Sequence, residues 1–359
     1  MTYYFENHSL LEDNKKPSAF LLEMNAEFTS LLAETTGLVG KLDGICRFAP
    51  NLDFCIKLLT IQEACASSEI ENAPARFYDF FKSDVISADS NLASNLFSAM
   101  QSIQEGTFSA SLIKKTHSII ATSEARESAY RDTQVLSRDN IFARHLTHPI
   151  LSSLIPAAIN DMAKYIMNGN DKSGLIKAAT IQYQLEVLSP FTQYSRAIAR
   201  IMAMFVLKWN GLLTHPILGL SDYLSKAKVE YKDRIAAAYR HDEDMLWIMW
   251  TKFFLLAVNE SAKKSICLIE RLSNDWQTHI ILLPQISNGN KSIYSIYEYA
   301  ANAVITNVRQ ISDALGLSFS NVSKVVKTFE DVGILRQVEK KERYRQFGYV
   351  PVLDFVDYV

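Results

Sequence analysis

The stretch SPFTQYSRAIAR, residues 189–200, joins two segments that have the apolar periodicity of helices. Pro190 removes a backbone donor and disfavours helical geometry at the residue before it, so we expect a turn between the two helices. The N-terminus of the second helix then faces the turn, where free N–H groups and the positive end of the helix dipole favour an anion. An ordinary helix–turn–helix junction explains the same residues equally well.

A nucleotide-handling site built on such a turn needs four kinds of group. Glycines let the backbone wrap a phosphate, a carboxylate holds Mg²⁺, a base deprotonates an attacking hydroxyl, and arginines hold phosphate oxygens. Residues 189–200 contain two arginines, Arg196 and Arg200, but no glycine, histidine or carboxylate. The turn has the position of an anion site without most of its chemistry.

The elements around this turn are predicted to be helical. The clearest apolar stripe has the spacing i, i+3, i+4, i+7, i+8 and ends at Asn210–Gly211, where a left-handed residue closes a helix. It consists of Ile198, Ile201, Met202, Phe205, Val206 and Trp209. Similar stripes predict helices within 20–45, 52–71, 93–105, 150–168, 173–188, 220–238 and 243–272. We therefore expect residues 1–280 to form an all-α unit around a buried central helix.

The pattern changes after a predicted linker at residues 281–292, which is rich in Pro, Gly, Asn and Ser. Residues 307–317 and 318–335 predict two short helices, the first capped by Asn307 and closed by Gly316. Two strand-like runs follow, 334–338 and 344–352, around the charged tip EKKER. This order predicts a winged helix-turn-helix over residues 293–359.

Composition excludes several classes of protein. The 359 residues are 48% hydrophobic with a net charge of −2, as in a globular protein rather than a polybasic chain that coats nucleic acid. Neither a signal peptide nor a membrane span is predicted, so we expect a cytoplasmic protein with no membrane partner. Cys46, Cys55, Cys65 and Cys267 are predicted to be reduced, and neither they nor the histidines have the spacing of a metal site.

Several segments resemble, in order and spacing, those of the Fic (Fido) family, which typically transfers AMP from ATP to a protein hydroxyl. The similarity covers about residues 20–280 and implies a Fic-type helical bundle, divided into an N-terminal helical region (1–110) and a core (111–280). SAYRDTQV (128–135) resembles the approach to the family's substrate-docking flap. The other segments are KLDGICRFAPN (41–51), EACASSEIEN (63–72), GLLTHPILGLSDYLSKAKVEYKDRI (211–235) and DMLWIMWTKFFL (244–255).

The family's core motif, H-P-F-x-(D/E)-G-N-G-R-x-x-R, aligns without a gap on residues 189–200 and matches only Pro190, Phe191 and Arg200. Ser189 replaces the histidine base, and a serine hydroxyl is not a base at neutral pH. Gln193 replaces the carboxylate that holds Mg²⁺, and its neutral amide is a poor ligand for that ion. The remaining replacements are Tyr194, Ser195 and Arg196 for Gly-Asn-Gly, and Ala197 for the first arginine.

We expect the side chains of Tyr194 and Arg196 to restrict the backbone angles that glycine allows. The resemblance then implies a catalytically inactive protein that needs no cofactor and serves as a regulatory or binding module. The alternative is an active nucleotidyl transferase with altered chemistry, in which Arg196 approaches a phosphate and ATP with Mg²⁺ is required.

SSEIEN, residues 67–72, matches the family's inhibitory signature (S/T)-x-x-x-E-(G/N) at Ser67, Glu71 and Asn72. In the family this glutamate pairs with the last arginine of the core motif and occupies the place of the γ-phosphate of ATP. Both partners are present here, so we predict a partly buried ion pair between Glu71 and Arg200. A surface carboxylate at a helix end is the simpler interpretation of these residues taken alone.

The second helix of the C-terminal module turns Val322, Val325, Val326 and Phe329 inward if it is amphipathic. DNA contact and a purely structural or protein-contact role both remain open, because residues 318–345 have only seven Lys/Arg against four Asp/Glu. A homodimer is a further expectation, and no target protein is indicated. The candidate DNA contacts are Ser320, Asn321, Ser323, Lys324 and Lys327 on the helix, and Lys340, Lys341, Arg343 and Arg345 on the wing.

Overall fold

The structure is a computed structural model that describes residues 26–81, 92–103, 106–122, 128–132, 151–168, 173–237, 243–338 and 345–358. Within these residues the chain is mainly helical, as predicted. It divides into two compact units. The first comprises Met1–Gly44, Ile56–Ala75 and Ser90–Ser265, and the second comprises Ile45–Cys55, Arg76–Asp89 and Ile266–Val359.

Three helices contribute to both units: α3 (Ala26–Arg47), α4 (Leu52–Ile70) and α12 (Glu243–Ile286). The short 3₁₀ segment η2 (Ser152–Leu154) leads into α7 of the first unit. The other described helices of that unit are α5 (Leu92–Ser102), α6 (Ala110–Ile120), α7 (Ile155–Asn168), α8 (Gly174–Leu188), α9 (Ser195–Trp209), α10 (Leu220–Lys226) and α11 (Lys228–Ala237).

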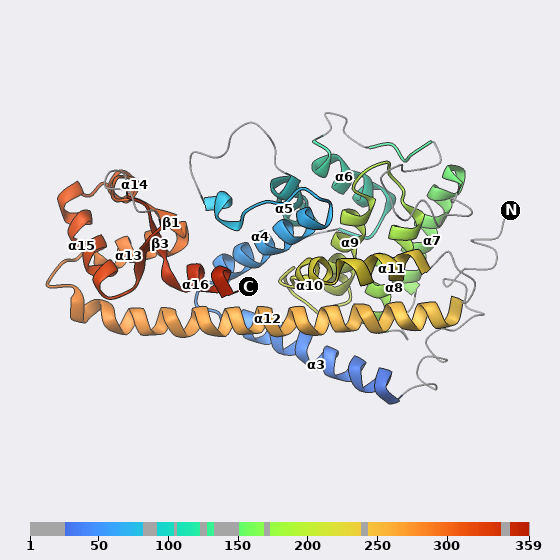
Figure 1. Ribbon diagram of the computed structural model, residues 1–359, viewed down its shortest axis with the longest axis horizontal. Helices are drawn as coiled ribbons and strands as arrows, with labels where there is room; N and C mark the ends of the chain where they lie inside the picture. The colour runs from blue at the N-terminus through green and yellow to red at the C-terminus, as the bar shows by residue number, and fades with distance from the viewer. Residues whose placement is uncertain are drawn as a thin grey trace. The chain divides into compact units, whose positions relative to one another are not determined.

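Helices α8 and α9 form the centre of the first unit and pack along each other (Figure 1). Every side chain of α8 from Leu175 to Leu188 is buried, which confirms the predicted central helix. Close packing begins at Gly174, where a Cβ atom would lie 2.8 Å from Cβ of Asn210. A larger residue at this position would push apart the start of α8 and the end of α9. The 189–194 turn is therefore supported by a rigid helix pair.

Helix α12 continues through residues 281–286, so the prediction that the linker begins at residue 281 is wrong. Leu283 is fully buried and continues the apolar pattern of the helix. Pro284 lies in the last turn, where its missing N–H removes one hydrogen bond of the helix but only two further residues follow it. The predicted turn begins only after Ile286, with Asn288 and Gly289 in the left-handed region.

The described part of the second unit contains η1 (Phe77–Phe81). It also contains three helices before the antiparallel pair of strands β2 and β3, and one helix after that pair. Its sheet has the order β1-β3-β2, with both pairings antiparallel. Strand β1 (Ile305–Thr306) was not predicted, because two residues are too few to show an alternating pattern. The other elements are α13 (Ile293–Ala303), α14 (Val308–Leu315), α15 (Phe319–Asp331), β2 (Leu335–Gln337), β3 (Phe347–Tyr349) and α16 (Val350–Tyr358).

In this unit the predicted ends of helix α14 are confirmed, but the predicted end of strand β3 is wrong. Asn307 and Gln310 form a capping box at the start of α14, and Gly316, with φ 63°, ends it. The strand predicted to extend to residue 352 instead ends at Tyr349, and α16 begins at Val350. Pro351 lies in the first turn of α16, where helices accept proline.

Among the described residues, no helix is both long enough and apolar enough to cross a membrane. All four cysteines are free, as predicted. Burial raises the pKa of the Cys55 thiol to about 12, so this thiol stays protonated at neutral pH.

Candidate functional site

The turn between α8 and α9 has two residues in the left-handed region, Ser189 with φ 45° and Tyr194 with φ 61°. The Tyr194 side chain, which was expected to restrict the backbone angles, does not prevent this residue from adopting a left-handed conformation. Ser195 stabilises the turn, because its hydroxyl accepts from the Phe191 N–H and donates to the Phe191 carbonyl, both at 2.9 Å. The turn thus holds two left-handed residues, although it contains no glycine.

The aligned motif residues differ in their exposure. Pro190, Phe191, Ser195, Ala197 and Arg200 are buried, Ser189, Tyr194 and Arg196 are half-buried, and Gln193 is exposed. Arg196 belongs to the first turn of α9 and not to the loop before it. Among the described residues, no three His, Cys, Asp or Glu side chains lie together as metal ligands. The exposed neutral amide of Gln193 is not a fit ligand for Mg²⁺.

Arg131, which was not predicted as a site residue, binds the backbone of the turn. Its Nε donates to the Ser189 carbonyl at 2.8 Å, and its Nη2 donates to the Leu188 carbonyl at 3.2 Å. Its backbone N–H donates to the Pro190 carbonyl at 3.0 Å. A buried cation on the last carbonyls of α8 complements the negative end of that helix. The position of Ser189 is fixed by these three bonds.

His117 is an imidazole beside the turn, and no sequence pattern predicted its position. Its ring stacks on Phe191 with centroids 4.0 Å apart, and its Nδ1 lies 2.7 Å from the Ser128 hydroxyl. Burial lowers its pKa, and a hydrogen bond with the backbone of Gln193 opposes that shift. The neutral ring therefore has hydrogen-bond partners on the protein and supports the turn.

The predicted ion pair between Glu71 and Arg200 is present. Nη2 of Arg200 donates to Oε1 of Glu71 at 2.9 Å, with the Arg200 side chain 0% and the Glu71 side chain 10% exposed. Arg200 also donates to the Ser67 hydroxyl from Nε at 3.2 Å and from Nη2 at 2.9 Å, and to the Ser67 carbonyl at 3.2 Å. Two residues of the signature SSEIEN thus bind the one arginine of the core motif that is conserved in type.

The third signature residue, Asn72, lies beyond the end of α4 with φ 62°. Its side-chain oxygen accepts from Nζ of Lys228 at 2.8 Å, and the same ammonium donates to the Glu69 carbonyl at 3.1 Å. Asn72 therefore connects the end of α4 to the start of α11. Glu71 also faces Arg196, whose Nη2 lies 4.0 Å from the second carboxylate oxygen. The carboxylate is placed between two guanidinium groups.

A second layer of polar side chains lies beneath Arg200. The Tyr231 hydroxyl donates to Oε1 of Glu186, and Nε2 of Gln182 donates to the same oxygen at 3.0 Å. Burial raises the pKa of Glu186, although the hydrogen bond from Tyr231 and the charge of Arg200 oppose the shift. Burial lowers the pKa of Arg200, but Tyr231, Glu71 and Glu186 raise it more strongly, so the guanidinium stays charged. Glu186 was detectable in the sequence as a lone carboxylate in an apolar helix.

Glu63 is a buried carboxylate that joins α4 to α10. Its two oxygens accept from the Ser221 N–H at 2.7 Å and the Ser221 hydroxyl at 2.5 Å. Burial raises its pKa from 4.5 to about 7, and the two hydrogen bonds from Ser221 limit the shift. This group titrates near neutral pH inside the unit that carries the ion pair.

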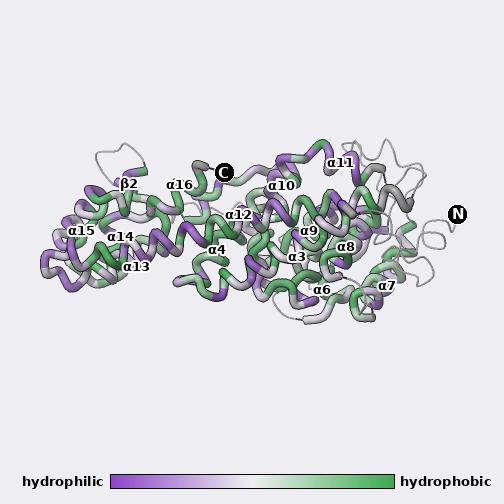
Figure 2. The backbone as a smooth tube through the Cα atoms, turned by 90° about the horizontal axis from the view of Figure 1, so that it is seen from below, coloured by the Kyte–Doolittle hydropathy of each residue, from purple (hydrophilic) through white to green (hydrophobic). Residues whose placement is uncertain are grey.

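The five candidate DNA contacts on the predicted second helix lie in α15, along which hydrophilic and hydrophobic residues alternate (Figure 2). Val322, Val325, Val326 and Phe329 are buried, as predicted, while Ser320, Lys324 and Lys327 are exposed. Ser323 is half-buried, and the half-buried Asn321 accepts a hydrogen bond from Asn290 at 2.6 Å. Arg345 is exposed, with its guanidinium 5.7 Å from the Phe347 ring. Lys340, Lys341 and Arg343 lie outside the described residues.

We predict that stability depends on pH through Glu63. Because its folded pKa is raised above the unfolded value of 4.5 to about 7, stability is highest below pH 4.5 and falls as pH rises to 7. Glu63→Gln imitates the protonated carboxyl and removes this term. We compare the unfolding free energies of the variant and the wild type at each pH. The variant's advantage should be about 1–3 kcal/mol larger at pH 8 than at pH 5. Urea unfolding at both pH values measures this difference, and a difference that does not change with pH would contradict the assignment.

Residues 29–107 match the model of the Fic/DOC family N-terminal region. The fold resembles the crystal structure of a Fic family protein from Desulfovibrio desulfuricans G20, with 15% identity, a TM-score of 0.56, and 91% of this chain and 96% of that chain covered. A Fic domain containing signaling protein from Bacteroides thetaiotaomicron VPI-5482 matches at 13% identity and a TM-score of 0.48, covering 66% of this chain and 98% of that one. The fold comparison rests on the first structure, so the chain has a match to the Fic/DOC family N-terminal region in residues 29–107 and a fold similar to that of a Fic family protein.

Proposed function

We propose that this Fic-fold protein no longer transfers a nucleotide and acts as a regulatory or binding module. The observation that carries the proposal is the state of Arg200, the surviving motif arginine. It is fully buried and bound to Ser67 and Glu71, so a phosphate can reach it only after that carboxylate moves. On this proposal the Glu71–Arg200 pair, inhibitory in active relatives, has a structural role here.

The groups around the turn support the loss of activity. Ser189 supplies no base at neutral pH, and the imidazole of His117 is held by Ser128 and stacked on Phe191. Loss of a general base alone typically costs about 10²–10⁴ in rate. With no carboxylate in place of Gln193, Mg²⁺ also has no ligand at this position of the turn. We therefore expect no requirement for ATP or Mg²⁺.

The alternative is a transferase with altered chemistry. It is favoured by the left-handed Tyr194, which keeps the loop shape, and by Arg196, which is 30% exposed and 4.0 Å from Glu71. In this alternative Arg196 binds phosphate in place of the missing first arginine, and ATP with Mg²⁺ is required. Ser189 at the motif position is not a base, and the His117 imidazole beside the turn is already held by Ser128 and Phe191, which weighs against this alternative.

Incubation with labelled ATP and Mg²⁺ distinguishes the inactive protein from the transferase with altered chemistry. Wild type and Glu71→Gly should both give no labelled protein, because removing the carboxylate frees Arg200 but restores neither base nor metal ligand. A Fic protein with an intact core motif serves as the positive control. Labelled product that depends on Arg196 in the Glu71→Gly background would establish the alternative.

The ion pair should contribute to folding even without catalysis. Glu71→Ala leaves the buried Arg200 charge uncompensated and should lower the unfolding free energy by about 3 kcal/mol. Glu71→Ala/Arg200→Met should lose about 1–3 kcal/mol less than the sum of the single variants. Glu27→Ala, which removes the exposed pair with Lys252 at 3.0 Å, is the control and should cost less than about 1 kcal/mol. Additive single effects in urea unfolding would show that the pair is not coupled.

For the C-terminal unit we propose a winged helix that binds DNA through α15. Its support is the order of elements from α13 to β3, together with the exposed Ser320, Lys324 and Lys327 on the helix that follows the tight turn. Asn321 is the weakest of the proposed contacts, because Asn290 already binds its side chain. The homodimer, the cytoplasmic location and the target protein remain predictions or unknown.

A mobility shift on duplex DNA tests this proposal. Binding at about 50 mM salt should weaken at 200 mM, because each phosphate contact releases counterions. Lys324→Ala and Lys327→Ala should each reduce the affinity and the salt dependence, whereas Lys115→Ala, an exposed lysine on α6, should leave both unchanged. The absence of binding at low salt would exclude DNA as the partner of α15.

A further inference from the structure

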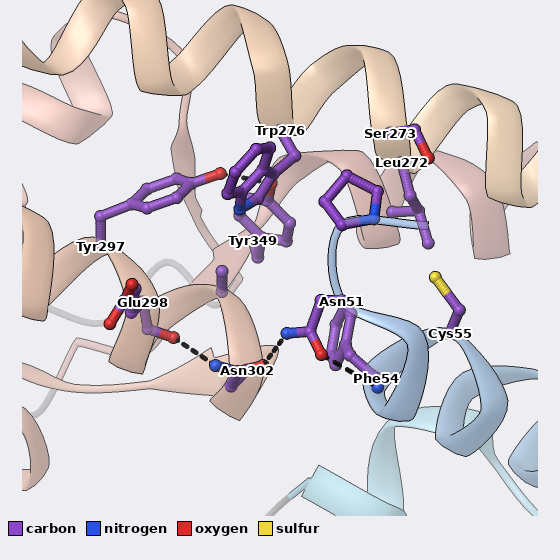
Figure 3. A pocket seen from close by; sticks show the side chains of 12 residues that line it. Asn51, Phe54, Cys55, Leu272, Ser273, Trp276, Tyr297, Glu298, Asn302 and Tyr349 are labelled. Atoms are coloured by element: carbon purple, nitrogen blue, oxygen red, sulfur yellow. Dashed lines mark hydrogen bonds between the residues drawn. The ribbon is translucent and has the colours of Figure 1, made fainter. Parts of the chain in front are cut away.

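A pocket of about 170 Å³ lies within the second unit, between the start of α4, the end of α12 and the elements α13 and β3 (Figure 3). In this view Trp276 and Tyr297 line one side and Asn51 and Phe54 line the other. Drug-sized ligands occupy about 300–1,000 Å³, so this pocket suits a small group rather than a nucleotide. Its remaining lining residues are Pro50, Cys55, Leu272, Ser273, Glu298, Ala301, Asn302 and Tyr349.

Tyr297 and Tyr349 line the pocket, but both side chains are buried and their hydroxyls have partners within the protein. Their hydroxyl oxygens lie 3.1 Å apart, and Nδ1 of His279 lies 3.2 Å from that of Tyr297 and 3.3 Å from that of Tyr349. Burial raises the pKa of Tyr297 to about 12 and raises that of Tyr349 as well, so both phenols are neutral at physiological pH. The walls are uncharged π surfaces.

The amides and the hydroxyl of the lining are also occupied. The Asn51 amide donates to Asn302 at 2.8 Å and accepts from the Phe54 N–H at 3.2 Å, while Asn302 donates to the Glu298 carbonyl at 2.9 Å. The Ser273 hydroxyl donates to the Ile269 carbonyl at 2.7 Å. These groups already bond to other groups of the protein, so they offer few hydrogen bonds to a ligand.

The carboxylate of Glu298 is the charged group of the lining. It is exposed, and among the described residues it has no ion pair or side-chain hydrogen bond. No lysine, arginine or histidine lines the pocket, so the local charge disfavours an anion. The half-buried Trp276 adds the aromatic ring that attracts cations most strongly.

We propose that this pocket binds an organic cation, a quaternary ammonium or guanidinium head, through the faces of its aromatic rings and the carboxylate of Glu298. Aromatic walls with a carboxylate and no competing cation match that chemistry, because the ring quadrupole and the negative charge both attract it. The cation belongs either to a small free molecule or to a side chain of a partner protein. The site is independent of the proposed role of residues 189–200.

Fluorine NMR of the full chain labelled with 5-fluorotryptophan tests the proposal. The protein has four tryptophans, and Trp276→Phe assigns the signal of residue 276. Choline represents a free ammonium and acetyl-arginine amide represents a protein side chain. We expect saturable millimolar shifts of the Trp276 signal with at least one of them, and the stronger ligand identifies the source. If neither ligand shifts this signal, the proposal is wrong.

Two comparisons separate charge recognition from simple apolar binding. The compound 3,3-dimethyl-1-butanol has the shape of choline without its charge, and it should bind at least about fivefold more weakly. Glu298→Gln should weaken the cation about two- to fivefold, whereas Glu330→Gln on α15 should leave it unchanged. Trp276→Ala should abolish binding of the cation, which is followed on an NMR signal of the ligand. If this variant does not fold, Glu298→Gln still tests the proposal. Equal binding of the charged and uncharged ligands would overturn the proposal.

Discussion

The buried charge of Arg200 is the constraint on which the rest of the first unit depends. A guanidinium with no exposed surface is stable only when an opposite charge and hydrogen-bond acceptors surround it. Glu71 and Ser67 supply these from the end of α4, and Glu186 with Tyr231 adds negative charge and polarity from α8 and α11. This constraint does not depend on catalysis, because the arginine needs its partners for as long as it stays buried.

The turn that precedes Arg200 is held by contacts within the protein. It contains no glycine, and Tyr194 adopts a left-handed conformation at an energetic cost that the surroundings must offset. The offsetting contacts are the three bonds from Arg131, the reciprocal bonds between Ser195 and Phe191, and the stacked ring of His117. Residues 189–194 are therefore held by contacts that have nothing to do with phosphate.

Sequence patterns predicted features that depend on local chemistry or on a short signature. The SSEIEN signature and Arg200 predicted the ion pair, and helical periodicity predicted the buried valines of α15. Contacts between distant segments could not be predicted from local patterns. Arg131 contacts Ser189, 58 positions away in the sequence, and Tyr231 contacts Glu186, 45 positions away. Proline positions misled in two ways: α12 continues two residues past Pro284, whereas the predicted strand ran through Pro351, which lies in the first turn of α16.

The central claim is that Glu71, and not a nucleotide, pairs with the buried arginine, and that the turn cannot bind a metal-bound triphosphate. Calorimetric titration of Mg·ATP into wild type and Glu71→Gly tests this most directly. The account predicts no saturable heat with either protein, because freeing Arg200 restores neither the carboxylate ligand nor the glycine loop. Micromolar binding to Glu71→Gly that disappears in Glu71→Gly/Arg200→Met would contradict it.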